Sequence, residues 1–363
     1  MTRIGINALY LIPGGVGGTE VYLRELLDAL SRIDSTNEYY VFTNEETDSL
    51  LVPKQANFQW RPQAIRARNR PARILWEQTI LPLEASRYKL NVLFNPGFTA
   101  PIIAPCPCVT VFHDLQHLRH PEYFRRFDLP AWRLLLWAAA HRADHLIAVS
   151  QSTRADLEHF YGIASAKISV VPHGVDARLY GLERDQIEPF LLCVSTLHPH
   201  KNLERLVRAY GRQKRTFRLV LAGMRGFHTE TIEQLIREMD LERQVTITGW
   251  LSRDELFELY NRALACVQPS TFEGFGMPVL EAMAAGVPLT CSDIAPHLEI
   301  VGSTTLTFDP LNEDAVAAAL ERITSDEDLR ERSTWLARER AREFTWERAA
   351  RDTLDALLGS KPN

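Results

Sequence analysis

The stretch PSTFEGFGMPVLEAMAAGVPLTCSD, residues Pro269–Asp293, decides the fold of this chain. The apolar run Leu264–Val267 before it predicts a buried strand, and the loop Gly274–Gly276 follows that strand. Pro278 favours the start of a helix, and Gly286 favours its end. Because the first N–H groups of a helix have no helical partner and lie at the positive end of its dipole, this unit suits an anion such as a diphosphate.

Two carboxylates frame this unit, Glu273 in the loop and Glu281 in the helix. An ionised glutamate accepts two hydrogen bonds and can hold a vicinal diol of a sugar. A diphosphate beside sugar hydroxyls describes a nucleotide sugar. Acidic residues are also favoured at helix starts for structural reasons, so the spacing alone leaves a purely structural role open.

The pattern E-G-F-G-M-P-x-L-E-A-M-A-x-G-x-P, residues 273–288, resembles the E-x7-E signature of the retaining GT-B glycosyltransferases of family 4. The resemblance implies that Glu273 is catalytic and positions the hydroxyls of the donor sugar, and that Glu281 binds the ribose diol. It further implies that the loop binds the donor through Gly274, Phe275, Gly276 and Met277.

Composition limits the class of protein. A chain of 363 residues with 45% hydrophobic content can form two ordinary cores, and no run reaches the roughly 18 apolar residues of a membrane-spanning helix. Met1 leads directly into an expected strand, so we expect no signal peptide. The five cysteines lack metal-ligand spacing, which predicts a reducing, cytoplasmic location without disulfides or zinc. The net charge of −5 gives no reason to expect a nucleic-acid partner.

A glycine-rich turn lies near the N-terminus. Arg3–Tyr10 alternates as a strand, Pro13–Gly18 forms the turn, and Thr19–Leu30 continues at helical spacing. This order suits a phosphate cradle, although contiguous glycines also fit a flexible surface loop. The turn resembles the family's G-G-x-E element, which implies that Gly17 and Gly18 close over the donor phosphates.

His113 and Asp114 follow the expected strand Val109–Phe112, at the end of a parallel strand where such sheets place ligands. A lone histidine at a strand end also commonly has a structural role. The segment HDLQHLRHPEYF resembles the family's His-Asp-Leu element. That resemblance implies that His113 reaches the donor sugar at the cleft between the domains.

Lys201 follows the expected strand Phe190–Val194 and precedes the expected helix Leu203–Tyr210. We expect Asn202 to cap this helix and Gly211 to end it. A lysine just before a helix N-terminus suits a phosphate group. With the family match, we expect Lys201 to be catalytic by stabilising the leaving diphosphate.

Relatives carry arginines near this lysine, whereas this chain has His200 and, further upstream, Ser195 or Thr196. We therefore name Thr196 as a donor-binding residue and expect Arg225 to supply the missing charge. Downstream, Trp250 and Leu251 follow the expected strand Gln244–Thr248. In the family, this position presents backbone groups to the nucleotide base, although Trp250 is equally suited to core packing.

Five arginines lie between Arg61 and Arg73, and no acidic residue occurs from Lys54 to Trp76. With Trp60 and Trp76 beside them, they suit an interfacial segment that binds anionic lipid headgroups on the inner face of a membrane. An ordinary solvated face explains the same run. Leu129–Arg142 is apolar nearly all round, so we expect a largely buried helix there.

The pattern of strands and helices alternates throughout and is broken once, near residues 175–190. It predicts the α/β class, with two doubly wound Rossmann-like domains. We expect an acceptor-binding domain at 1–178, a nucleotide-sugar-binding domain at 179–343, and a final segment at 344–363. The GT-B resemblance implies that the domains face each other across a cleft and that the last helix crosses back to the first domain.

The function implied by the resemblance is a retaining transferase that moves a hexose from a nucleotide-diphospho-sugar to a saccharide or lipid-linked acceptor. The His-Asp-Leu element and the segment Trp76-Glu-Gln resemble polysaccharide mannosyltransferases, which favours GDP-mannose. UDP-glucose and UDP-N-acetylglucosamine satisfy the same motifs. No DxD-type metal site stands out, so we expect no cofactor and no metal requirement.

Three alternatives remain open. A glycoside hydrolase needs two carboxylates across the scissile bond, whereas one strand–helix unit places both on one side of the ligand. A nucleotide-sugar epimerase shares the GT-B fold and converts the donor by itself. A nucleotide-binding scaffold, which is not an enzyme, binds the nucleotide without releasing it from the donor.

Overall fold

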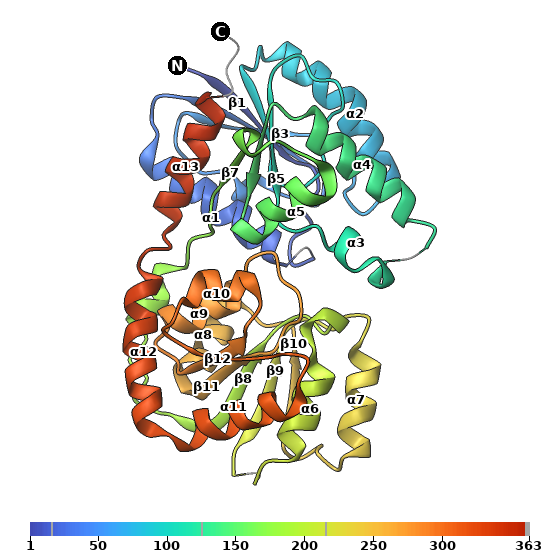
Figure 1. Cartoon of the computed structure of the whole chain (residues 1–363). Coiled ribbons are helices and arrows are strands. Elements are labelled where there is room, and N and C mark those ends of the chain that lie inside the picture. The colour runs from blue at the N-terminus through green and yellow to red at the C-terminus, as the bar shows by residue number, and fades with distance from the viewer. Residues whose placement is uncertain (16, 125, 215, 360–363) are drawn as a thin grey trace. The chain divides into compact units, whose positions relative to one another are not determined.

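The computed structural model describes residues 1–363 except 16, 125, 215 and 360–363. The chain divides into two compact units (Figure 1). Unit 1 comprises Met1–Gly174 with Trp346–Asn363, and unit 2 comprises Val175–Thr345. Each unit contains one parallel sheet with helices on its faces, which confirms the predicted α/β class and the two Rossmann-like domains.

The sheet of unit 1 has the order β3-β2-β1-β4-β5-β6-β7 over the described residues, and every neighbouring pair is parallel. The order reverses between β1 and β4, which is where doubly wound sheets bind ligands. Its inner strands β1 and β5 are buried on both faces and mostly apolar, because helices cover both sides of the sheet. The strands are β1 (Arg3–Ala8), β2 (Glu38–Thr43), β3 (Phe58–Pro62), β4 (Val92–Asn95), β5 (Cys108–Phe112), β6 (His145–Ala148) and β7 (Ile168–Val170).

The last helix of the chain belongs to unit 1. It packs against α1, and the rings of Tyr22 and Trp346 lie 6.0 Å apart. The expected return of this helix to the first domain is therefore confirmed. The helices of unit 1 are α1 (Gly18–Ile33), α2 (Arg70–Arg87), α3 (Gln116–Arg119), α4 (Leu129–Arg142), α5 (Gln151–Tyr161) and α13 (Trp346–Gly359), with the 3-10 turns η1 (Ser49–Leu51), η2 (Pro121–Tyr123) and η3 (Ser165–Lys167).

Two expectations for unit 1 were wrong. Helix α4 is not largely buried, because it packs through Leu136 and three alanines while Leu134 and Trp137 remain 65% and 49% exposed. The arginine run is not one surface segment either, because Arg61 lies in strand β3 and Arg73 is buried in α2. Arg73 Nη1 lies 3.9 Å from Glu77 Oε2, and that carboxylate also accepts hydrogen bonds inside the unit.

The sheet of unit 2 has the order β10-β9-β8-β11-β12-β13 in the described part of the chain. Its order reverses between β8 and β11, so the loops after these strands lie at the ligand-binding edge. The strands are β8 (Glu188–Val194), β9 (Arg218–Ala222), β10 (Val245–Gly249), β11 (Ala263–Gln268), β12 (Leu289–Ser292) and β13 (Leu306–Phe308).

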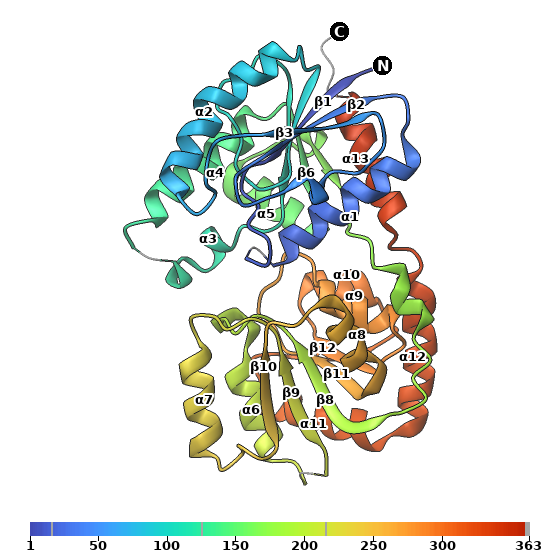
Figure 2. The ribbon, with the colours of Figure 1, turned by 180° about the vertical axis from the view of Figure 1, so that it is seen from behind.

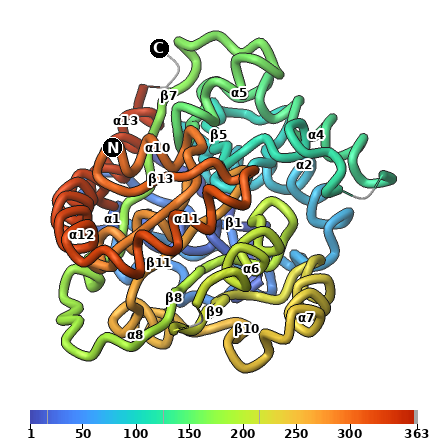
Figure 3. The backbone as a smooth tube through the Cα atoms, turned by 60° about the horizontal axis from the view of Figure 1, so that its bottom comes forward, coloured from blue at the N-terminus to red at the C-terminus, as the bar shows by residue number. Residues whose placement is uncertain are grey.

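The helices of unit 2 enclose an apolar core centred on the inner strands. Helices α6 and α11 lie side by side over the sheet (Figure 3). The helices are α6 (Leu203–Gly211), α7 (Thr229–Glu238), α8 (Arg253–Arg262), α9 (Met277–Ala284), α10 (Ala295–Val301), α11 (Glu313–Ser325) and α12 (Glu327–Ala341), with the 3-10 turns η4 (Ala177–Gly181) and η5 (Pro199–Lys201).

Of three expected helix ends in unit 2, one is confirmed and two are confirmed only in part. Gly286, with φ of 67°, follows the C-cap of α9 as predicted. Gly211, in contrast, is the last residue of α6 rather than a residue beyond it. Asn202 occupies the N-cap of α6, but its φ is 58° and its side chain does not accept a helix N–H.

Candidate active site

The loop between β11 and α9 has the predicted strand–loop–helix geometry. Gly276 is the N-cap of α9 and has φ of 126°, a conformation that side chains other than hydrogen disfavour. A Cβ atom at this position would lie 2.9 Å from the His297 ring. The loop therefore approaches α10 closely and leaves the N-terminus of α9 directed toward the carboxyl edge of the sheet.

Lys201 and Glu273 form an ion pair at this edge, with Lys201 Nζ 2.6 Å from Glu273 Oε1. Ser270 Oγ donates to the same oxygen at 2.7 Å. Burial alone would raise the pKa of Glu273, but the charge and hydrogen bond of Lys201, together with His297 and His200, outweigh it and lower the pKa to about 2. Both side chains keep about one seventh of their surface exposed (15% and 14%), so a ligand can reach them.

The loops that carry this pair are tied together by hydrogen bonds. Thr271 N donates to His200 O at 2.8 Å, which fixes η5 beside the β11–α9 loop. The amide of Asn202 donates to the Pro269 carbonyl at 3.0 Å and to the Pro310 carbonyl at 2.8 Å. This use of the Asn202 amide explains why its side chain does not cap α6. The distance between Lys201 and Glu273 is therefore set by the backbone and not by the two side chains alone.

Glu281 lies in the third quarter of α9 and is 5% exposed. Tyr260 Oη donates to Glu281 Oε2 at 3.1 Å, and Arg253 Nη1 lies 3.7 Å from Glu281 Oε1. Both partners come from α8. Tyr260 and Arg253 therefore orient the Glu281 carboxylate from the side of α8.

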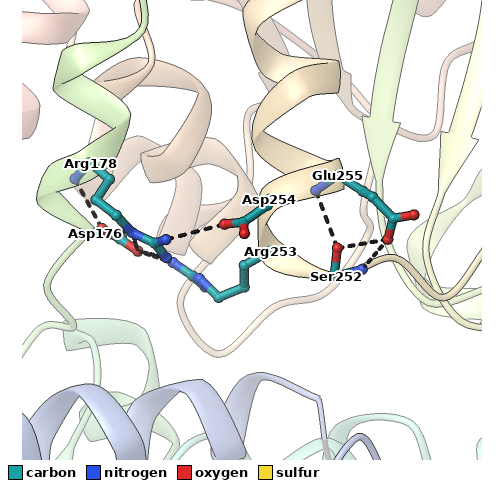
Figure 4. Close-up of polar contacts among 6 residues, drawn as sticks. All are labelled: Asp176, Arg178, Ser252, Arg253, Asp254 and Glu255. Carbon is teal, nitrogen blue, oxygen red and sulfur yellow. Dashed lines mark hydrogen bonds and ion pairs between the residues drawn. The ribbon is translucent and has the colours of Figure 1, made fainter.

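Arg253 is itself held by an ionic cluster (Figure 4). Its Nη2 lies 2.9 Å from Asp176 Oδ2, and Arg178 donates to the same carboxylate. Burial would raise the pKa of Asp176, but the hydrogen bonds from Arg178 and Arg253 lower it. Figure 4 also shows the capping box that starts α8, in which Ser252 and Glu255 each accept a backbone N–H of the other. This cap fixes Arg253 at the first position of the helix.

The remaining donor-binding candidates of unit 2 lie at the same sheet edge but contact different groups. Thr196 follows β8, and its carbonyl accepts from His198 N at 2.8 Å. Trp250 is exposed and Leu251 half-buried after β10, so the core-packing alternative for Trp250 is excluded. Arg225 forms an exposed ion pair with Glu233 of α7, and its assignment to the donor stays a prediction.

His113 in unit 1 is buried directly after β5. Its Nε2 lies 2.8 Å from the Pro96 carbonyl, so Nε2 donates and Nδ1 is the unprotonated nitrogen. Burial lowers the pKa of His113 to about 4, although the Pro96 carbonyl opposes the shift. The imidazole is therefore neutral near pH 7, and Tyr22 and Phe98 pack against its ring.

Gly17 and Gly18 lie at the exposed N-terminus of α1 in unit 1. Apart from the glycine itself and its chain neighbours, no atom of the described residues lies within 4 Å of a Cβ built on either residue, so the space beside them is open. Glu20 Oε2 accepts from Gly14 N at 2.7 Å and holds the turn closed. This open space can admit a ligand, and the contact of Gly17 and Gly18 with the donor phosphates stays a prediction.

Sequence reasoning missed four neighbours of the candidate residues. Ser270 and His297 surround Glu273, and Tyr260 and Arg253 orient Glu281. Burial lowers the pKa of His297 to about 4. Ser270 precedes Glu273 by three residues in the same loop. Tyr260, Arg253 and His297 have no such local signal, because α8 and α10 meet α9 only through tertiary packing.

Within the described chain, no group of three or more His, Cys, Asp or Glu side chains is arranged to hold a metal ion. In the same residues, every helix is too short or too polar to span a bilayer.

Family models match both parts of the chain. The model of Glycosyltransferase Family 4 matches residues 16–179, and the model of Glycosyl transferases group 1 matches residues 181–340. The chain is a GT-B glycosyltransferase of the family 4 type. The predicted family, the predicted fold class and the predicted transferase activity are therefore confirmed.

Relatives of this glycosyltransferase include two mannosyltransferases. The O-antigen chain mannosyltransferase B of Escherichia coli is 28% identical over 284 residues, which cover 74% of each chain. The O-antigen chain mannosyltransferase RfbU of Salmonella typhimurium is 28% identical over 211 residues, or 58% of this chain and 59% of the relative. The match thus spans less than two thirds of the second relative.

Among solved structures, Anabaena HepE in complex with UDP and glucose superposes with a TM-score of 0.78 at 18% identity. The superposition covers 99% of this chain and 100% of HepE. At this identity the likeness establishes the fold.

Proposed function

We propose that the glycosyltransferase moves a hexose, with retention of configuration, from a nucleotide-diphospho-sugar to a saccharide or lipid-linked acceptor in polysaccharide biosynthesis. The observation that carries this proposal is the Lys201–Glu273 pair beside the N-terminus of α9. One positive charge, one carboxylate and a set of helix N–H groups converge at the same edge of the sheet, although Lys201 stands far from the other groups in the sequence. They suit the diphosphate and the hydroxyls of a nucleotide sugar.

In the proposed reaction, the bond between the anomeric carbon and the diphosphate oxygen breaks, and its electron pair stays on the diphosphate. The Lys201 ammonium and the N–H groups of α9 stabilise this developing charge. The acceptor oxygen bonds to the anomeric carbon from the same face, and its proton passes to the departing diphosphate oxygen. Glu273 holds sugar hydroxyls, and the neutral His113 imidazole offers a further hydrogen-bonding group for the donor sugar.

Because Lys201 and helix N–H groups supply the positive charge, we propose that transfer needs no divalent metal and no cofactor. For the ribose, the Glu281 carboxylate provides two acceptor oxygens whose direction Tyr260 fixes. The loop residues from Gly274 to Met277 bind the diphosphate in this proposal. Trp250 and Leu251 lie beside the base.

We propose GDP-mannose as the donor, since two relatives carry the name mannosyltransferase. HepE, whose structure holds UDP and glucose, favours UDP-glucose as the alternative. A panel of GDP-mannose, UDP-glucose and UDP-N-acetylglucosamine tests the choice by thermal stabilisation, which follows affinity. Stabilisation by GDP and GDP-mannose above the UDP compounds is expected. A preference for UDP compounds would overturn the donor assignment.

The same panel separates the rival activities. An epimerase converts the donor alone into a second nucleotide sugar, and a scaffold binds the donor without releasing the nucleoside diphosphate. A transferase releases it when a saccharide acceptor is added. Release that depends on the acceptor is the expected result.

A peripheral membrane location on the cytoplasmic side is a second proposal, which a surface of unit 1 favours. Helices α2 and α4 lie side by side on this unit (Figures 1 and 2). Leu75 and Leu83 of α2 and Leu134 and Trp137 of α4 are exposed on them. We call these four side chains the α2/α4 apolar surface. Exposed apolar side chains that gather on one surface can contact another protein or a membrane.

Arginines at the start of α2 complement this surface. Arg66, Arg68 and Arg70 are exposed, and Arg70 lies 5.4 Å above the Trp132 ring of α4. Each exposed arginine near an anionic membrane contributes about 1 kcal/mol. Arg73 is buried and Arg61 stacks on Tyr88, so neither belongs to the surface. We propose that the apolar side chains enter the interface and that the three exposed arginines meet the headgroups.

Co-sedimentation with vesicles of phosphatidylglycerol and phosphatidylcholine tests the membrane proposal. Replacement of Leu134 and Trp137 by Ser should release the protein, whereas Leu311→Ser with Trp335→Ser, which changes exposed residues of unit 2, should not. Binding should weaken at about 1 M salt, where the Debye length is about 3 Å. Equal sedimentation of both variants at both salt concentrations would contradict the proposal.

A further inference from the structure

A pocket of about 380 Å³ lies between the edge strand β3 and helix α2 of unit 1. On α2, its wall is made by Trp76, Ile80, Glu84 and Arg87, which lie on one face of the helix at spacings of three and four residues. Over the described residues, β3 is the terminal strand of the sheet of unit 1 and pairs with β2, and its residues Trp60, Arg61 and Pro62 line the pocket. Neither the donor motifs nor the α2/α4 apolar surface uses these residues.

The aromatic rings of the pocket are held in fixed orientations. Trp60 Nε1 donates to Thr43 Oγ1 at 2.8 Å, and Trp76 Nε1 donates to Gln63 Oε1 at 3.2 Å. Both indole N–H groups are therefore satisfied inside the protein, and the ring faces remain for contact. Trp60 stays 41% exposed, which is unusual for a ring whose polar edge is already anchored.

Planar polar groups stand beside these rings. The Arg61 guanidinium lies 4.7 Å above the Tyr88 ring, and its buried Nε–H has no hydrogen-bond partner among the described residues. At the rim, Arg87 Nη1 donates to Glu84 Oε1 at 3.3 Å. The pocket thus combines flat apolar faces with hydrogen-bond donors and acceptors that are already oriented.

These features select one class of ligand. A pyranose ring has a face of C–H groups that packs on an indole and a rim of hydroxyls that bind guanidinium and carboxylate groups. A hydrocarbon chain would give no acceptor to the buried Arg61 Nε–H, which has no hydrogen-bond partner among the described residues, and an unsatisfied buried donor is costly. A diphosphate would place its negative charge beside Glu84. The combination of rings and mixed charges therefore fits a saccharide.

We propose that the pocket between β3 and α2 binds a sugar unit of a glycan chain, apart from the donor site. In the sheet, β3 is separated from β1 by β2, so the pocket lies roughly 10 Å along the sheet from the switch point. An enzyme that extends a polysaccharide holds a chain longer than its reacting sugar. This inference rests on the proposed function, because it takes the bound sugar to be part of the acceptor.

Titration of the full-length protein with mannotetraose, cellotetraose and maltotetraose, each followed by saturation-transfer NMR, tests the proposal. At least one of these probes should bind the wild type. Trp60→Ala should weaken that binding at least tenfold, which corresponds to about 1.4 kcal/mol. Trp335→Ala, which removes an exposed tryptophan of unit 2, is the matched control and should leave binding unchanged.

Arg87→Ala is a second pocket variant, for the case in which Trp60→Ala does not fold. Arg87 is exposed at the rim, and its replacement should also weaken saccharide binding. Thermal stabilisation by nucleotide, measured on every variant, should stay at the wild-type level. Absence of binding for all three probes, or equal binding by wild type and both pocket variants, would overturn the proposal. If the wild type does not bind any nucleotide, the proposed function is contradicted. Saccharide binding by the wild type and its loss in the pocket variants can still be measured in that case.

Discussion

Replacement of Lys201 by alanine removes the positive charge that lies nearest to Glu273. In the free protein, Lys201 Nζ is 2.6 Å from Glu273 Oε1 and both groups are largely buried. In the proposed reaction the same ammonium stabilises the diphosphate as the glycosidic bond breaks. Removal of one preorganised group of this kind lowers turnover by roughly a hundredfold to a thousandfold, or about 2.7–4 kcal/mol.

Steady-state release of the nucleoside diphosphate, measured with donor and acceptor at saturation, gives this effect directly. Lys201→Arg keeps the charge and should recover part of the turnover, although a guanidinium does not reproduce the geometry of an ammonium. Lys54→Ala, at an exposed site of unit 1, is the matched control and should behave as the wild type. Turnover of the Lys201→Ala variant within threefold of the wild type would refute the assignment.

Three further predictions follow from the same site. Glu281→Ala should weaken nucleotide binding by about 1.5–3 kcal/mol for each lost hydroxyl contact, and Tyr260→Phe should weaken it less; unchanged calorimetric affinity in both would contradict the ribose assignment. Glu273 is ionised in the folded state with a pKa of about 2, below its ordinary 4.5, so its pair with Lys201 contributes stability above pH 4.5 that is lost as the pH falls toward 2. The difference in denaturation free energy between wild type and Lys201→Ala should shrink over that interval, and a constant difference would argue against the pair. Added EDTA should leave turnover unchanged, whereas an absolute requirement for magnesium or manganese would exclude the metal-free proposal.

The loop between β11 and α9 could be predicted from sequence because its signals are local. Pro278 and Gly286 mark the ends of α9 within a short segment, and the apolar run of β11 precedes them directly. The position of Lys201 just before α6 could also be predicted from local sequence signals. Backbone geometry at such places depends on neighbouring residues and little on the rest of the fold.

Other features depended on contacts that sequence does not display. Arg73 was assigned to a charged surface, but the turn of α2 directs it inward toward Glu77. Helix α4 was expected to be buried because its pattern is apolar all round, yet only one face packs on the unit. Asn202 was expected to cap α6, and its amide instead binds two carbonyls from distant loops.

The partners of the two glutamates were missed for the same reason. Tyr260 looks like a core residue of α8 in the sequence, and only the packing of α8 on α9 brings its hydroxyl to Glu281. His297 stands in α10, where its ring fills the space that the absent side chain of Gly276 leaves. Tertiary packing brings Tyr260 to Glu281 and His297 to the loop of Glu273.

The most direct test of the central claim is acceptor-dependent release of nucleoside diphosphate by purified protein, compared between wild type and Glu273→Ala. The donors are GDP-mannose and UDP-glucose, and the acceptor is a mannose-containing oligosaccharide. The account predicts that the wild type releases the nucleoside diphosphate and forms a lengthened saccharide with one of them. It also predicts that Glu273→Ala binds the nucleotide nearly as well but turns over far more slowly. Equal turnover by the two proteins would contradict the account.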